Sequence, residues 1–405
     1  MQTEVVIVGA GPAGTTLGLM LAQAGIDCVV LERQTRDYVL GRIRAGVLEW
    51  TTVEILDSLG AGGRMHAEGH VHSGVDIGWR SSEILRVDFQ RVTGRPMMAY
   101  GQTEIQKDLY ARADEIGVTM VFEADDVELH QVSENGAGDG PHAGDTAAHP
   151  HVTFTANGET QRIDCRSIAG CDGYHGVSRG AIPDRAKTEY EKAYPFGWLG
   201  ILSETPPLPS LMYANSERGF ALCSQRNPML SRYYVQCPLT DTVDDWSDDR
   251  FWSELLARVP ASTAERIVTG PSIEKSIAPL RSYVVEPMQW GNLYLAGDSA
   301  HIVPPTGAKG LNLAMSDVRF LADAFIARAG GDPAPLERYS ETALARVWGS
   351  VRFSWWLTLL LHRFPDQTDF DQRAQEQDLY YLASSEAAQA SMSEQYVGLP
   401  LYADS

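Results

Sequence analysis

The sequence is short of positive charge. Its 405 residues contain 33 lysines and arginines against 53 aspartates and glutamates, which gives a formal net charge of −20. Binding to nucleic acids and to anionic membranes depends on lysines and arginines that displace counterions. So acidic a chain therefore excludes polyanions as its main partners.

Cysteines and long apolar runs are also scarce. The five cysteines are odd in number and include no CxxC pair, which is typical of a reduced intracellular protein. The apolar run 353–361 is far shorter than the roughly 20 residues of a membrane span. Glycines and Pro12 interrupt the apolar stretch 5–26, which also lacks the basic start of a signal peptide. We expect a cytoplasmic protein without a membrane partner.

Strands and helices alternate at the start of the chain. Residues 4–8 and 28–32 read as buried strands, and residues 13–24 read as a helix between them. A further helix is expected near 103–116, and a further strand at 118–122. This order is typical of a parallel sheet covered by helices.

Three glycines lie between the first strand and its helix, in the spacing GxGxxG. Gly9 permits a tight turn, Gly11 lets a pyrophosphate approach the backbone, and Gly14 allows close helix–strand packing. The phosphates then lie at the helix N-terminus, and Glu32 can accept hydrogen bonds from ribose hydroxyls. The motif predicts a bound dinucleotide but does not distinguish NAD(P) from FAD.

The later parts of the chain change in character. Residues 133–150 are small, polar and glycine-rich, which indicates a surface loop. Short alternating strands with turn signals between about 190 and 240 predict an antiparallel sheet. The strand–helix style returns at 292–298, and the chain is mostly helical from about residue 313.

Two further strand–turn–helix motifs carry polar groups. Asp298 ends a strand and can bind the hydroxyls of a ribityl chain. The helix that follows offers backbone N–H groups near Gly310, Leu311 and Asn312 to the pyrimidine edge of a flavin. The other motif, residues 171–179, contains Asp172. Two sites of this kind do not suit NAD alone.

Three such motifs in this order resemble the FAD-dependent aromatic hydroxylases, the single-component flavoprotein monooxygenases. The resemblance covers nearly the whole chain to Pro400, fails at 133–150, and is most specific for members that act on 4-hydroxybenzoate. The runs that carry it are 32–49, 194–200, 213–226, 276–287 and 301–312.

The resemblance implies a mixed α/β fold in three parts. A Rossmann-like FAD-binding domain would comprise residues 1–70, 101–187 and 290–320. A substrate domain with an antiparallel sheet would comprise 71–100 and 188–289. A helical C-terminal region, 321–405, would contribute to a homodimer interface.

The hairpin 220–236 offers groups for an anionic substrate. On its strands Ser224 and Arg226 share one face, as do Arg232 and Tyr234, so the two pairs can converge on one carboxylate. The resemblance assigns Ser224, Arg226 and Tyr234 to the substrate carboxylate. It places Arg232 near the flavin.

The resemblance also assigns Tyr213 to the substrate phenol, with the backbone of Pro305 at the pocket. A proton would pass from Tyr213 through Tyr396 and His72 to solvent, which suits histidine because it titrates near neutral pH. Spacing alone favours the interpretation that both tyrosines are amphipathic core residues.

A basic cluster follows Glu32 and stands out in an acidic chain. It comprises Arg33, Gln34, Tyr38, Arg42 and Arg44. By sequence alone it reads equally as a solvated loop. The resemblance gives this cluster to the nicotinamide cofactor, with Arg33 and Tyr38 selecting a 2′-phosphate.

The resemblance adds His175 and Arg281 to the contacts of the nicotinamide cofactor, and we therefore predict NADPH. It also adds Arg42, Arg44 and Gln102 to the FAD site. The expected reaction is hydroxylation of 4-hydroxybenzoate at its 3-position to 3,4-dihydroxybenzoate, with O2 as co-substrate, through a flavin C4a-hydroperoxide. The alternatives are a related enzyme for another phenolic acid and a non-catalytic FAD-fold binding protein.

Two other patterns favour plainer interpretations. Residues 176–180 fit GxSxG, but the intervening residues separate Ser178 from its strand, so we expect Ser178 to start a helix rather than act as a nucleophile. His66, His70 and His72 have metal-like spacing without completing ligands, so we expect a surface segment and no metal.

Overall fold

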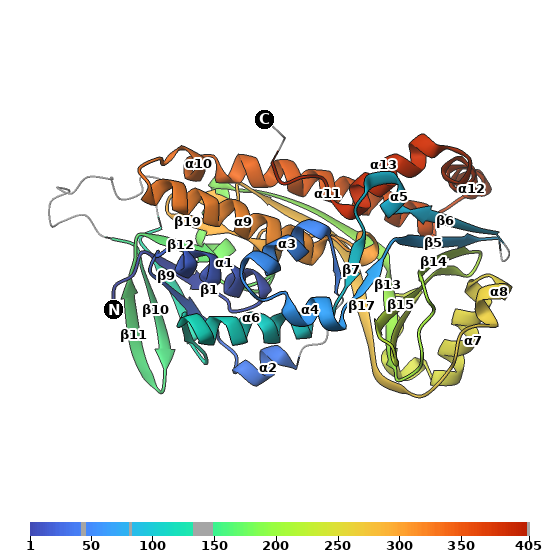
Figure 1. The fold of residues 1–405 in the computed structure, drawn as a ribbon, viewed down its shortest axis with the longest axis horizontal. Helices are drawn as coiled ribbons and strands as arrows, with labels where there is room; N and C mark the ends of the chain where they lie inside the picture. Colours follow the sequence, from blue (N-terminus) through green and yellow to red (C-terminus); the bar gives the residue numbers. More distant parts are fainter. Residues whose placement is uncertain (42–45, 81–82, 133–148, 403–405) are drawn as a thin grey trace.

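The computed structural model describes residues 1–41, 46–80, 83–132 and 149–402, and it shows a mixed α/β fold (Figure 1). The fold class expected from the sequence is confirmed. Arg42, Arg44 and most of the expected loop 133–150 lie outside the described residues. The boundaries of the three predicted parts stay a prediction.

One sheet builds the dinucleotide half of the molecule. Its strands run in the order β18-β19-β12-β1-β2-β8 and pair in parallel, except that β18 is antiparallel to its neighbour. The four residues of β1 are all buried, as the apolar pattern predicts. The bounds are β1 (Val5–Val8), β2 (Cys28–Leu31), β8 (Thr119–Val121), β12 (Ser167–Gly170), β18 (Gln289–Trp290) and β19 (Leu293–Leu295).

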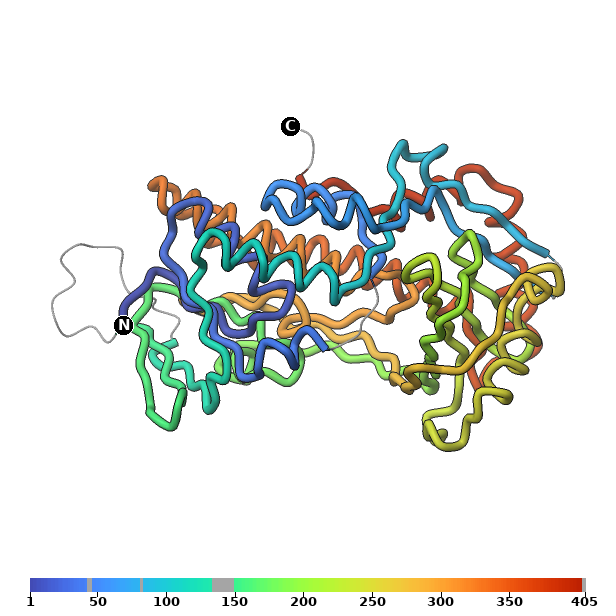
Figure 2. The backbone as a smooth tube through the Cα atoms, turned by 60° about the horizontal axis from the view of Figure 1, so that its bottom comes forward, coloured from blue at the N-terminus to red at the C-terminus, as the bar shows by residue number. Residues whose placement is uncertain are grey.

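Three helices pack beside this sheet. Helix α1 (Pro12–Gln23) contacts both α6 (Gln102–Ile116) and α9 (Gly310–Ala329). Figure 2 shows α6 in teal running along the blue N-terminal elements. Helix α1 can lie close to its strand because Gly14 has no side chain. A Cβ at this position would come within 1.8 Å of the Gly9 carbonyl oxygen. The packing role that the motif predicts for Gly14 is confirmed.

A second, larger sheet forms the other half. Its strands run in the order β20-β17-β13-β16-β15-β14-β5-β6, and all neighbours are antiparallel except β14 and β5. The bounds are β5 (Gly74–Trp79), β6 (Glu83–Asp88), β13 (Thr188–Ser203), β14 (Leu211–Ser216), β15 (Gly219–Asn227), β16 (Leu230–Pro238), β17 (Ser272–Glu286) and β20 (His301–Ile302).

The antiparallel sheet is confirmed, but the expectation of short strands is wrong for β13, which has 16 residues. Its first six residues are exposed and nearly all of the rest are buried. The period-2 pattern therefore changes halfway, and the sequence reads as two short segments.

Helices cover the antiparallel sheet on both faces. Helix α7 (Asp248–Arg258) and α8 (Ala261–Ala264) lie against one face, and the C-terminal helices lie over the other (Figure 1). The C-terminal part is helical, as predicted: α10 (Ala334–Glu337), α11 (Tyr339–Leu361), α12 (Asp369–Ser384) and α13 (Glu386–Val397). None of the helices in the described ranges is long and apolar enough to cross a membrane.

Two small sheets and several short elements complete the fold. One sheet holds β9 (Asp125–His130), β10 (His151–Ala156) and β11 (Glu159–Asp164). The other holds β3 (Val47–Leu48), β4 (His70–His72) and β7 (Met97–Ala99). The short helices are α2 (Arg36–Leu40), α3 (Trp50–Ser58), α4 (Gly63–Glu68), α5 (Phe89–Thr93), η1 (Ser178–Ala181), η2 (Asp184–Ala186), η3 (Val243–Asp245), η4 (Gly297–Ser299) and η5 (Pro305–Gly307).

Candidate active site

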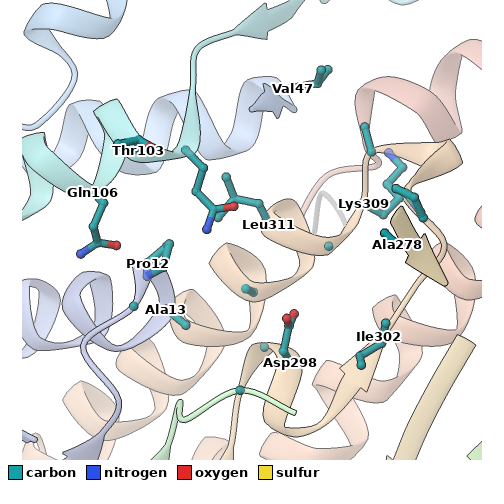
Figure 3. Close-up of a pocket in the computed structure, with 18 of the residues that line it drawn as sticks. Pro12, Ala13, Val47, Thr103, Gln106, Ala278, Asp298, Ile302, Lys309 and Leu311 are labelled. Atoms are coloured by element: carbon teal, nitrogen blue, oxygen red, sulfur yellow. The ribbon is translucent and has the colours of Figure 1, made fainter. Parts of the chain in front are cut away.

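A cavity of about 650 Å³ lies between the two large sheets. One end is lined by the β1–α1 turn and the start of α6, and the other by strands β13 to β17. Figure 3 shows Pro12 and Ala13 on one side of it, with Lys309 and Ala278 on the other and Asp298 pointing in between them. Residues from both halves of the fold therefore share one cavity.

The β1–α1 turn makes a cradle without side chains. Gly9 has φ +101°, and a Cβ there would lie 2.4 Å from the Cys171 carbonyl oxygen. A Cβ at Gly11 would meet nothing within 4 Å, because this residue faces the cavity. Backbone N–H groups at the start of α1 are therefore accessible to a phosphate group.

Two carboxylates stand beside this cradle. The oxygens of Glu32 accept hydrogen bonds from the Ala10 and Gln34 N–H groups, each at 2.9 Å. Asp172 Oδ2 accepts two bonds from Ser178, whereas its buried Oδ1 has no partner. Burial raises the pKa of Asp172. Both residues also line an adjoining cavity of about 300 Å³, where they can accept hydrogen bonds from the hydroxyl or amide groups of a ligand.

Helix α9 points its N-terminus into the same cavity. Gly310 and Leu311 line it, so their unsatisfied N–H groups can meet a partly negative ligand. Asn312 does not line it: its side chain accepts from Glu49 N and Thr52 Oγ1 and braces the helix start. Asn312 therefore supports the site from behind.

Asp298 enters the cavity from a braced turn. Asp317 Oδ2 accepts a hydrogen bond of 2.9 Å from Gly297 N and lies 2.6 Å from His301 Nε2. His301 and Asp317 are both buried. Burial alone would lower the pKa of His301, but the Asp317 carboxylate outweighs it and the pKa is raised. This pair fixes the loop that carries Asp298.

These groups together fit FAD. The cradle at Gly11 suits a pyrophosphate, Glu32 suits a ribose, Asp298 suits the ribityl chain, and the start of α9 suits the polar edge of the flavin ring. The orphaned Oδ1 of Asp172 fits a further hydroxyl or amide partner. Gln102 also lines the cavity.

Strand register sets the other end of the cavity. Leu222 of β15 lies opposite both Tyr213 of β14 and Tyr234 of β16, and Ser224 lies opposite Arg232. Gly200 of β13 pairs with Tyr234, and a Cβ there would come within 2.6 Å of the tyrosine ring. The strand pairing thus places polar side chains of three neighbouring strands in two rows across one sheet face, with Leu222 between the two tyrosines of one row.

Arg226 is a cation of this face whose hydrogen-bonding groups are only partly used. Its Nη1 atom donates to Ser224 Oγ at 3.4 Å and to the Gln225 carbonyl at 3.0 Å, and its enclosed Nε atom has no partner. Burial lowers the pKa of Arg226. Ser224 itself donates to the Arg232 carbonyl at 2.9 Å. A carboxylate in the cavity would supply the missing acceptors.

A buried pair of tyrosines lies next to this face. Tyr213 lines the cavity, and its hydroxyl lies 2.6 Å from that of Tyr396 and donates to the Thr306 carbonyl at 3.0 Å. Burial raises the pKa of both tyrosines, and the bond from Tyr396 partly offsets this for Tyr213. The hydroxyls form a short chain that leads away from the cavity.

His72 lies in β4 and does not line the cavity. It is 7% exposed, and burial, followed by the charges of His70 and Arg86, lowers its pKa to about 4. Pro305 lines the cavity at the start of η5, one residue from the Thr306 carbonyl that Tyr213 contacts.

Comparison with known proteins identifies the family. Residues 2–354 match the family model described as an FAD binding domain. The chain is 49% identical over 404 residues to the p-hydroxybenzoate hydroxylase of Acinetobacter baylyi, with 99% of this chain and 96% of that protein covered. This chain belongs to the FAD-binding family of aromatic monooxygenases. It is a flavoprotein aromatic monooxygenase, as the sequence motifs predicted.

Other relatives of the monooxygenase are more distant. It is 25% identical to the phenazine 1,6-dicarboxylic acid hydroxylase PhzS of Lysobacter antibioticus, over 80% of this chain and 82% of that protein. The crystal structure of p-nitrophenol 4-monooxygenase PnpA from Pseudomonas putida DLL-E4 has the same fold, with a TM-score of 0.78 and 17% identity over 98% and 99% of the two chains.

The described residues predicted for the reductant lie along the two adjoining cavities and beside the Tyr174 ring. Arg33, Gln34 and Tyr38 line the large cavity, and His175 lines the smaller one together with Arg33. Arg281 lines neither of these two cavities. Its guanidinium lies over the Tyr174 ring, 4.9 Å from the ring centroid. The roles predicted for these residues, and for Arg42 and Arg44 outside the described ranges, stay predictions.

Sequence reasoning missed a buried charge network in the monooxygenase. Lys309 lines the cavity and lies 2.6 Å from Glu49 Oε1, and Arg346 Nη2 lies 2.7 Å from Glu49 Oε2. The lysine stands in the run PTGAKG, which resembles a phosphate loop only superficially. No local spacing links it to Glu49.

A second group that the sequence did not reveal surrounds Arg232. Its Nη1 lies 2.9 Å from Glu274 and its Nη2 donates to Ser276 at 3.0 Å, and all three line the cavity. Trp198, another lining residue, donates to the buried His362 at 2.7 Å. Ser178 starts η1 and is buried, so the expectation that it is no exposed nucleophile is confirmed.

Within the described ranges, no group of three or more histidine, cysteine, aspartate or glutamate side chains could hold a metal ion. His66 lies 2.8 Å from Asp57 instead of joining His70 and His72.

Proposed function

We propose that this monooxygenase hydroxylates 4-hydroxybenzoate at its 3-position to give 3,4-dihydroxybenzoate, with NADPH as the reductant. The observation that carries the proposal is one sheet face that holds an under-partnered Arg226 and a buried Tyr213–Tyr396 pair. The first suits a carboxylate and the second suits a phenol. A para-hydroxylated benzoate has both groups at opposite ends of one ring.

The carboxylate end is defined by charge. Arg226, Ser224 and Tyr234 line the cavity together, and Arg226 has an enclosed N–H group without an acceptor. An arginine fork binds a carboxylate through two parallel bonds, which fixes both the distance and the plane of the ligand. The aromatic ring is thereby held in one orientation.

The phenol end is defined by the tyrosine pair. Tyr213 can exchange a proton with the substrate hydroxyl and pass one to Tyr396 at 2.6 Å. Ionisation of the phenol raises the electron density at the neighbouring ring carbon. Bound FAD, once reduced, would activate O2 for attack on that carbon. Tyr213, Tyr396 and His72 would handle the proton, and the apolar side chains Leu211 and Leu222 would exclude water.

The reductant is proposed from the basic residues beside the dinucleotide cradle. Arg33, Gln34 and Tyr38 line the cavity next to Glu32, and Arg33 can pair with a 2′-phosphate. A phosphate there would favour NADPH over NADH. The named relative with 49% identity is a p-hydroxybenzoate hydroxylase, which supports the aromatic substrate and the hydroxylation.

The test is a steady-state assay of the purified holoenzyme. We expect a yellow protein whose NADPH oxidation is stimulated by 4-hydroxybenzoate and yields 3,4-dihydroxybenzoate on chromatography. The 2- and 3-hydroxy isomers and 4-hydroxybenzamide serve as matched substrates. Stronger stimulation and product formation with another phenolic acid would overturn the substrate. Equal kcat/KM with NADH would overturn the choice of reductant.

We also propose that the enzyme is a cytoplasmic homodimer. All five cysteines are free, as suits a reducing compartment. The C-terminal helices carry exposed aromatic side chains, among them Phe370 (80% exposed) and Tyr381 (61% exposed). Analytical ultracentrifugation that returns a monomer of 44.4 kDa would contradict the dimer.

A further inference from the structure

Strand β4 carries two histidines whose rings touch. His70 and His72 are two residues apart, so their side chains lie on the same side of the strand. Their ring centroids are 4.7 Å apart in an edge-to-face arrangement. His70 is exposed and His72 is buried, so the pair spans the boundary between the interior and solvent.

The surroundings leave His72 isolated from other acceptors. Strand β7 (Met97–Ala99), which pairs with β4, brings no titratable side chain. Arg86 acts on His72 by its positive charge, but its guanidinium is bound to Asp76 at 3.1 Å and to Ser73 at 3.0 Å. Among the described residues, the His72 imidazole makes no hydrogen bond to a protein group, and the titratable ring that contacts it is His70.

His72 is a poor final holder of a proton. With its pKa at about 4, only roughly one molecule in a thousand would carry the proton on His72 at pH 7. A proton that reaches His72 must therefore pass on to another acceptor.

We propose that His70 is the outer proton-transfer residue of this enzyme, which takes the phenol proton from His72 and releases it to solvent. In each transfer one ring nitrogen loses a proton and the next acceptor gains it. His72 donates to His70, and His70 donates to water or buffer. This proposal rests on the proposed function, because the phenol proton is the one that is moved.

The experiment measures proton release when substrate binds. Holoenzyme in weak buffer with a pH indicator is mixed rapidly with 4-hydroxybenzoate, and the phenolate absorbance is followed in parallel. The variants are His70→Gln and His72→Gln. His66→Gln is the matched control, because His66 is another exposed histidine nearby that contacts Asp57.

We expect His70→Gln to slow proton release by about tenfold, with the final amount of phenolate nearly unchanged. Free imidazole should restore the rate in this variant, since it replaces the missing carrier. His66→Gln should behave as wild type. A wild-type rate in His70→Gln, or a slow rate that imidazole does not restore, would overturn the role of His70.

The arms of the experiment separate two kinds of failure. If wild-type enzyme binds 4-hydroxybenzoate and releases no proton, the proposed function fails, and the role of His70 fails with it. If wild type releases the proton and only His72→Gln is slow, the proposed function stands and the role of His70 alone is refuted.

Discussion

Replacement of Arg226 by lysine tests the substrate end of the cavity most directly. The Arg226 side chain presents a planar fork, of which Nη1 contacts Ser224 Oγ and the Gln225 carbonyl while Nε has no partner. Lysine keeps the positive charge but offers a single ammonium group. It can therefore attract a carboxylate without the second, parallel hydrogen bond.

The size of the effect follows from the bond that is lost. One hydrogen bond to a charged group contributes about 1.5–3 kcal/mol, and each 1.4 kcal/mol is about a tenfold change in Kd. We expect Arg226→Lys to raise the Kd for 4-hydroxybenzoate by roughly 10- to 150-fold. The effect should be at the upper end because the Nε atom is enclosed, where a lost partner is not replaced by water.

The assay is a titration of the oxidised holoenzyme, followed by the change in flavin absorbance. Arg218→Lys is the matched control, because Arg218 is exposed and contacts Glu254 on the surface. 4-Hydroxybenzamide, which has no carboxylate, should bind wild type and Arg226→Lys with similar Kd. An unchanged Kd for 4-hydroxybenzoate, or an equal loss for the amide, would refute the carboxylate role of Arg226.

Four further outcomes are expected from three variants. Tyr213→Phe should lower product per NADPH and release H2O2 instead, because the phenol then lacks its proton acceptor; tight coupling would refute this role. Asp317→Asn should weaken FAD retention by roughly 3 kcal/mol, as is common when a buried ion pair is broken, and equal FAD Kd would contradict it. Because Asp317 raises the pKa of His301, the stability from this pair should be complete below about pH 6.5 and fall as pH rises through the higher folded pKa; Asp317→Asn should flatten this loss in thermal melts. Arg33→Ala should lower kcat/KM for NADPH by about tenfold and leave NADH nearly unchanged, whereas an equal fall for both would argue against 2′-phosphate recognition.

The dinucleotide half could be predicted because its signals are local. Gly9, Gly11 and Gly14 lie within six residues, and the strand before them and the helix after them have clear apolar patterns. The pairing of Ser224 with Arg232 is similarly local, since it joins the two strands of one hairpin, whose two-residue turn and bulge between Gln225 and Asn227 together set the register. Short-range geometry is sufficient for both.

The contacts that complete the site join distant parts of the chain. Tyr213 and Tyr396 are 183 residues apart, and Lys309 and Glu49 are 260 apart, so no spacing rule connects them. The tyrosine pair was expected only through the family resemblance. Glu274 faces Arg232 because β17 pairs with β13 in one register, which depends on the packing of the whole sheet.

The net charge of −20 gives no indication of how the cavity handles anions. At the dinucleotide end, Glu32 accepts hydrogen bonds from two backbone N–H groups, and Asp172 accepts two hydrogen bonds from Ser178. These donors stabilise the carboxylates, which can then stand beside a phosphate that is itself bound by backbone N–H groups. At the other end, no carboxylate among the described residues forms an ion pair with Arg226, whereas Arg232 has Glu274. The acidic surface therefore coexists with one local excess of positive charge, and that excess lies where the proposed substrate carboxylate must bind.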